Sequence, residues 1–179
     1  MTTLTAPALS RRSLLKVGLL GGAVLATAGV TVALVDRFSA TPAEGYRALR
    51  PADLPILFAL APVMLDGAVA PERLPEASHS TVRALDAQLD HLSPEMLKLT
   101  RQMLDVLALP VTRGPLSGIW GSWENATPEA VRGFLARWEN SPLALLRMGH
   151  ASLLQLVMMA WYGQPDSWAH CGYPGPPTV

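Results

Sequence analysis

The side chains most often used for metal binding and catalysis are sparse in this sequence. Its four histidines are His79, His91, His150 and His170, and its one cysteine is Cys171. No two histidines lie three or four residues apart, the spacing that places two ligands on one face of a helix. His170 and Cys171 are adjacent, so they would need distant ligands to hold a metal. The sequence therefore predicts no metal and no cofactor in this chain.

Other catalytic patterns are also missing. The sequence contains no G-x-S-x-G turn, no phosphate-binding loop and no dinucleotide fingerprint. Cys171 would need an activating histidine and an electropositive setting to act as a nucleophile. We therefore expect no catalytic residues, with Cys171 either a free thiol or bonded to another chain. His150 is expected to be a buried or partner-facing polar group.

The composition favours one domain without a nucleic-acid partner. The chain has 179 residues, of which 50% are hydrophobic and 16% are charged. From Thr41 onward, ten basic and thirteen acidic residues give a net charge of about minus three. Binding to DNA or RNA would require clustered Lys and Arg, which this composition does not supply.

Residues 1–40 are interpreted as an export address and not as part of the fold. Arg11 and Arg12 are followed by a serine, by two apolar residues of which the second is Leu15, and then by Lys16 and a long uncharged segment. This order resembles a twin-arginine signal, which directs already folded proteins to the twin-arginine translocase. The resemblance implies that the chain is exported to the periplasm by that translocase.

The uncharged segment covers residues 17–35. Nineteen apolar residues are roughly enough to span a bilayer, so the segment is either a cleaved signal or a retained anchor in the inner membrane. An ordinary secretory signal or membrane anchor with arginines beside it is the alternative interpretation.

Three short motifs after this segment predict helix starts, because each places a hydroxyl at the N-cap and a proline at the first helical position. They are Ser93-Pro94-Glu95, Thr127-Pro128-Glu129 and Ser141-Pro142. Together with the apolar periodicity they predict an all-α fold, a small bundle of about five helices in a domain over residues 41–162. The expected helices are 51–66, 78–91, 94–109, 128–139 and 142–162.

Two segments of this domain differ from an ordinary amphipathic pattern. Residues 142–162 are apolar on almost every side after Arg147, which predicts the central helix of the bundle, with a helix covered by a partner or lying in a membrane as the alternatives. Residues 110–125 contain Gly114, Gly118 and Gly121 and are expected to be irregular. This loop is predicted either to fold over the core or to form part of a contact surface.

The end of the chain is unusually aromatic. Residues 163–179 are predicted to be an extended arm, because glycine and proline are frequent in them. The residues expected to dock on a partner are Trp161, Tyr162, Trp168, Tyr173 and Pro174. The alternative is an arm that folds back over its own bundle.

The stretch WYGQPDSWAHCGYPGPP, residues 161–177, resembles the C-terminus of small subunits of bacterial flavin-dependent dehydrogenases. In that family an aromatic pair is followed by a proline, a tryptophan and a final G-Y-P-G-P. His170 and Cys171 depart from the pattern, which has small or apolar residues there. The complexes that act on sorbitol, fructose and gluconate belong to this family.

The resemblance implies a non-catalytic small subunit that escorts and stabilises a large dehydrogenase of the glucose-methanol-choline class. That partner would hold FAD and would lack a signal of its own. A stand-alone exported or membrane-anchored helical protein is the alternative.

Overall fold

The computed structural model describes residues 41–175, so the signal or anchor helix expected within residues 1–40 lies outside the described part. The described residues form helices and turns without a named strand, which confirms the all-α class for this part of the chain. The α-helices are α3 (Leu54–Met64), α4 (Leu74–Asp90), α5 (Pro94–Ala108), α6 (Pro110–Ser117), α7 (Pro128–Glu139), α8 (Ala144–Tyr162) and α9 (Pro165–Cys171). Two short 3-10 helices, η1 (Pro71–Arg73) and η2 (Trp123–Asn125), precede α4 and α7.

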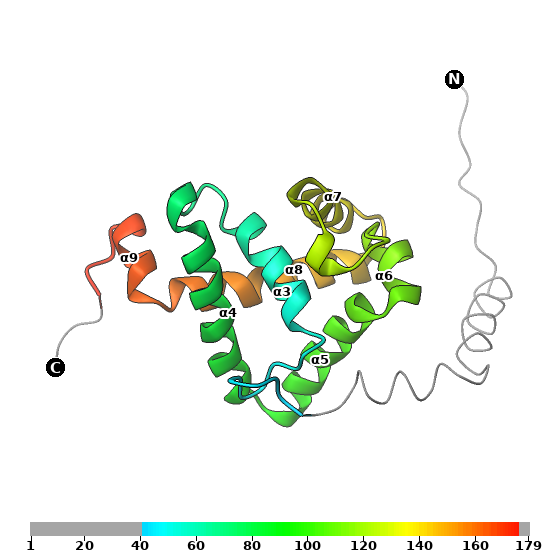
Figure 1. Ribbon diagram of the computed structural model, residues 1–179, viewed down its shortest axis with the longest axis horizontal. Coiled ribbons are helices and arrows are strands. Elements are labelled where there is room, and N and C mark those ends of the chain that lie inside the picture. The colour runs from blue at the N-terminus through cyan, green and yellow to red at the C-terminus, as the bar shows by residue number, and fades with distance from the viewer. Residues whose placement is uncertain (1–40, 176–179) are drawn as a thin grey trace, which may run out of the picture. The chain divides into compact units, whose positions relative to one another are not determined.

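Helix α3 lies at the centre of this arrangement. It contacts α4, α5, α7, α8 and η2, and α8 runs behind it in the view of Figure 1. Its inner face buries Ile56, Leu57 and Leu60 completely or almost so. Pro62 was expected to kink or end the helix, and α3 ends two residues after it, at Met64.

Two of the three predicted helix starts are confirmed by their caps. The Ser93 hydroxyl accepts a hydrogen bond from the Met96 N–H at 3.3 Å, and the Thr127 hydroxyl accepts one from the Ala130 N–H at 3.2 Å. The third start is shifted, because the Ser141 hydroxyl accepts from the Leu143 N–H in a tight turn and α8 begins only at Ala144.

We expect Thr127→Ala to lower the free energy of unfolding by about 1 kcal/mol, since it removes the side-chain N-cap of α7. Urea denaturation of the purified chain measures this change. Ser152→Ala, at an exposed position inside α8, is the matched control and should not destabilise, because alanine favours a helix interior. Equal stability of the two variants would contradict the assigned cap.

An aromatic cluster holds the segment between α5 and α7 on the core. Phe134 makes edge-to-face contacts with Trp123 and Trp138, with ring centroids 5.7 and 4.8 Å apart. The indole N–H of Trp123 donates to the Leu107 carbonyl at 2.8 Å, and that of Trp138 donates to the Leu116 carbonyl at 2.9 Å. Trp123 is therefore a core residue, which favours the folded-over alternative for this part of the segment.

The expectation of an irregular segment over residues 110–125 was wrong, because residues 110–117 form α6. Pro110 occupies the start of this helix, and Gly118 ends it in the left-handed conformation with φ of 74°. Gly114 lies inside α6 beneath the ring of Trp120, where a Cβ atom would collide with the indole. Gly118 thus allows the helix to end, and Gly114 allows the Trp120 ring to approach the helix closely. Neither glycine prevents the helix from forming.

A buried carboxylate fixes the segment that leads into α3. Asp86 of α4 is 5% exposed and accepts hydrogen bonds from the backbone N–H groups of Arg47, Ala48 and Leu49 at 2.8 to 2.9 Å. The Ala43 N–H closes the same loop by donating to the Leu49 carbonyl at 2.7 Å. The Asp86 carboxylate therefore accepts the hydrogen bonds that these three consecutive backbone N–H groups would otherwise make within a helix or a sheet.

Next along the chain, Arg50 is 3% exposed and forms ion pairs with Asp53 at 2.8 Å and Asp105 at 2.6 Å. Burial lowers the pKa of this guanidinium, but the hydrogen bonds to the two carboxylates outweigh burial and raise its pKa above the ordinary value. Arg50 therefore stays charged at neutral pH, and its two ion pairs tie the start of α3 to α5.

Candidate docking surfaces

The histidines are not gathered into a site in the described residues. His79 packs on Phe58 with ring centroids 4.7 Å apart, and His91 caps the end of α4 through the Ala87 carbonyl at 2.7 Å. His150 is half-buried on α8. Among the side chains that the structure describes, no three or more His, Cys, Asp or Glu are arranged to hold a metal.

Helix α8 was expected to be the central helix of the bundle, and this expectation was wrong. Only one of its faces is covered, where Leu153, Val157 and Ala160 are almost fully buried. The helix packs mainly against α4 and α7, with smaller contacts to α9 and α3. The opposite face also carries large apolar side chains, and among the described residues most of these stay exposed.

The uncovered face of α8 carries a regular stripe of six residues. They are Leu145, Met148, Ser152, Gln155, Met159 and Tyr162, and this set is called the α8 stripe below. Their spacing alternates between three and four residues, as in the contact seam of two packed helices. The exposed fractions of Leu145, Met148 and Met159 are 77%, 65% and 57%, which is unusual for such large apolar side chains along one line.

Helix α8 carries basic side chains but no acidic ones. The helix contains Arg147 and His150 but no Asp, Glu or Lys. The Arg147 guanidinium donates to the Ser141 carbonyl at 2.6 Å, which anchors it at the start of the helix. Ser152 and Gln155 supply polar groups at the middle of the α8 stripe, so a partner helix needs a hydrogen-bonding group opposite them.

The C-terminal segment is not extended throughout, which corrects the prediction for residues 163–179. Residues 165–171 form α9, since Pro165 stands at a helix start and the acidic Asp166 lies in the first turn. Beyond α9, the Tyr173 N–H donates to the Trp168 carbonyl at 2.9 Å, and the two rings meet edge to face at 5.5 Å. Residues 172–175 therefore turn back onto α9.

The structure buries one of the residues predicted to dock on a partner and exposes others. Trp161 is 2% exposed and packs with Leu65 and Ala77, so its ring belongs to the chain's own core. Tyr162 and Tyr173 are 46% and 47% exposed, and Pro174 is exposed. The Trp168 indole donates to the Tyr162 carbonyl at 3.2 Å, which places this aromatic group beside the end of the α8 stripe.

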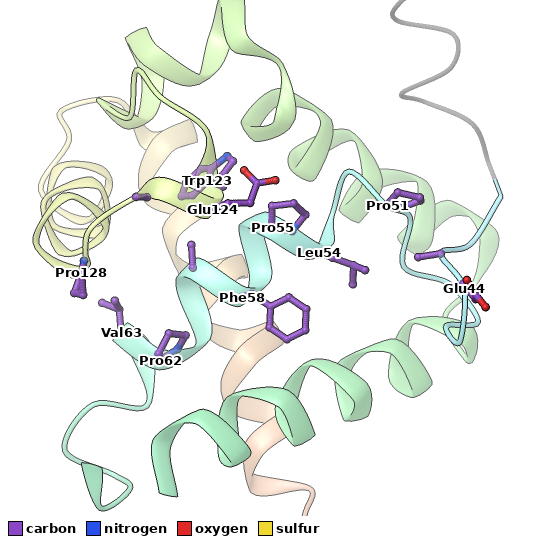
Figure 2. A pocket seen from close by; sticks show the side chains of 13 residues that line it. Glu44, Pro51, Leu54, Pro55, Phe58, Pro62, Val63, Trp123, Glu124 and Pro128 are labelled. Atoms are coloured by element: carbon purple, nitrogen blue, oxygen red, sulfur yellow. The ribbon is translucent and has the colours of Figure 1, made fainter. Parts of the chain in front are cut away.

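A groove on α3 is the second candidate surface. It has a volume of about 720 Å³ and is shown in Figure 2. One wall is the outer face of α3, the far wall comes from the segment around η2 and the start of α7, and one end comes from the segment before α3. The α3 residues that line it are Leu54, Pro55, Phe58, Ala59, Pro62 and Val63.

The remaining predicted sites fall outside what the structure describes. The export residues Arg11, Arg12, Leu15 and Lys16 and the apolar segment 17–35 belong to residues 1–40. Among the helices of residues 41–175, none is both long enough and apolar enough to cross a membrane.

Neither the α8 stripe nor the α3 groove was predicted from the sequence as a contact surface. The sequence shows the spacing of three and four residues along the α8 stripe. It shows equally that the opposite face of the helix is apolar. Helical periodicity alone could not decide which of two apolar faces the bundle covers. Comparison of the chain with protein-family models, with curated proteins and with solved structures found no match.

Proposed function

We propose that this chain is a non-catalytic subunit that binds a larger protein through the α8 stripe. The observation that carries the proposal is the row of exposed apolar side chains on α8, from Leu145 to Tyr162. Eighteen helical residues extend over about 26 Å, a length that suits pairing with a helix or groove of another chain. Covering such a row on binding removes apolar surface from water, which is the main driving force of association.

The aromatic pair Trp168 and Tyr173 extends this surface. It lies beside Tyr162 at one end of the α8 stripe, and aromatic side chains dominate the energetics of protein interfaces. A stable interface covers about 800 Å² on each partner, more than a single helix stripe supplies. The α8 stripe and the aromatic pair together form the proposed interface.

The identity of the partner is proposed from the sequence. The aromatic, glycine- and proline-rich C-terminus resembles that of dehydrogenase small subunits, and the N-terminus resembles a twin-arginine signal. The partner is then a large FAD-dependent dehydrogenase of the glucose-methanol-choline class. The small subunit escorts the folded partner through the twin-arginine translocase to the periplasm, and residues 17–35 hold the complex at the inner membrane if they are retained.

Co-expression tests this function. The full chain carrying an affinity tag is produced together with a signal-less FAD-dependent dehydrogenase from the same genome. We expect a one-to-one complex in the periplasm, with flavin absorbance that follows the large chain after the two are separated. Recovery of the tagged chain alone from cells that contain both proteins would contradict the proposal and favour a stand-alone helical protein.

A further inference from the structure

The α3 groove is a half-buried apolar surface on a helix that is apolar on both sides. The side chains at Leu54, Phe58 and Pro62 face the groove, whereas Ile56, Leu57 and Leu60 face the core. A helix that is apolar all round is normally covered on all sides. The groove is therefore a place where a further apolar segment could complete the cover of α3.

The charged residues that line the groove are both acidic. Its lining contains Glu44 and Glu124, both exposed, and no Lys, Arg or His. In Figure 2, Glu44 lies at the end beyond Pro51, and Glu124 lies beside Trp123 on the far wall. The two carboxylates thus stand at separate places along an apolar floor.

This pattern restricts the chemistry of the occupant. Carboxylates at the rim repel the anionic headgroup of a phospholipid and the carboxylate of a fatty acid. They attract a cationic side chain, and complementary charges at the rim of an interface favour the correct partner. The floor, in contrast, offers no charged group and takes apolar side chains.

We propose that the α3 groove binds an apolar segment of another protein that carries Lys or Arg on both flanks. This inference goes beyond the proposed function, because it concerns a different surface. The groove is formed by the outer face of α3, and α8 contacts the opposite side of the bundle core, behind α3 in Figure 1. A segment in the groove and a partner on the α8 stripe can be bound at the same time.

Three synthetic peptides test the proposal with the full-length chain. They share one apolar core of leucine and alanine and differ only in their ends, which are Lys, Gln or Glu. Binding is followed by fluorescence anisotropy of a dye on each peptide. We expect the Lys-ended peptide to bind about fivefold more tightly than the Glu-ended one, because each exposed ion pair contributes modestly. Equal affinities, or no binding of any of the three, would overturn the proposal.

Variants assign the preference to the groove. Glu44→Gln combined with Glu124→Gln should abolish the preference for Lys ends, whereas Phe58→Ala should weaken all three peptides alike. The control combines Glu72→Gln with Glu139→Gln, which removes the same charge at exposed positions outside the groove. A preference that survives in the Glu44/Glu124 variant would show that binding occurs elsewhere and would reject the groove.

The same variants separate this proposal from the proposed function. The Glu44/Glu124 variant should still form the complex with the large dehydrogenase subunit, because the α8 stripe is unchanged. The complex with the large subunit could also fail to form with the wild-type chain and with every variant, while the peptides bind as expected. That result would contradict the proposed function and leave the groove proposal standing.

Discussion

Replacement of Asp86 by alanine is expected to lower the free energy of unfolding by about 3 to 5 kcal/mol. The carboxylate accepts three backbone hydrogen bonds, and two of the donors, the N–H groups of Ala48 and Leu49, are buried. Each buried amide left without a partner costs about 1 to 3 kcal/mol, and alanine offers no replacement acceptor. The loop over residues 43–50 then loses its attachment to α4.

Urea denaturation of wild type and variant measures this loss. Asp90→Ala is the matched control, because Asp90 is exposed and lies 3.9 Å from Arg47 in a weak surface ion pair. Its removal should cost less than about 1 kcal/mol. Similar losses for Asp86→Ala and Asp90→Ala would show that the three backbone hydrogen bonds do not hold the loop.

The loop that Asp86 fixes also forms one end of the α3 groove. Ala43, Glu44 and Pro51 line the groove there. Disorder in this loop should therefore disrupt the proposed peptide site as well as the core. Asp86 is best described as a positioning residue for the groove, since it does not line it.

Short-range rules explain what could be predicted from the sequence. A hydroxyl followed by proline marks the starts of α5 and α7 correctly, because the capping hydrogen bond joins residues only three positions apart. The same rule fails by two residues at Ser141, where the hydroxyl forms a local turn with Leu143 first. The all-α class follows from several such signals and does not depend on any one of them.

Long-range contacts explain what could not be predicted. Asp86 and the loop that it holds are separated by 37 to 39 positions, and no local pattern connects them. The helix α6 forms although its sequence contains Gly114, because Trp120 packs against the glycine from outside the helix. The exposure of the α8 stripe likewise depends on which helices surround α8, and the sequence does not state that directly.

The second prediction concerns the α8 stripe. Met148→Asp combined with Met159→Asp is expected to weaken binding to the large dehydrogenase subunit by at least about 100-fold. Both side chains are exposed in the isolated chain, at 65% and 57%, so aspartate there remains solvated. In the complex the two carboxylates would lose water without gaining a partner, a cost of at least about 2.7 kcal/mol.

The isolated chain should tolerate the same change. Aspartate inside a helix costs roughly 0.5 kcal/mol relative to better helix formers, and no core contact is removed. Met96→Asp combined with Leu99→Asp is the matched control. These residues are 52% and 59% exposed on α5, so they test whether any exposed apolar pair has the same effect.

The most direct measurement is a calorimetric titration of the large subunit with wild type, the Met148/Met159 variant and the Met96/Leu99 variant. Denaturation curves of the three chains, recorded beside it, should show that all are folded. We predict that the α5 variant binds like wild type and that the α8 variant binds at least about 100-fold more weakly. Wild-type affinity of a folded α8 variant would contradict the claim that the α8 stripe is the interface.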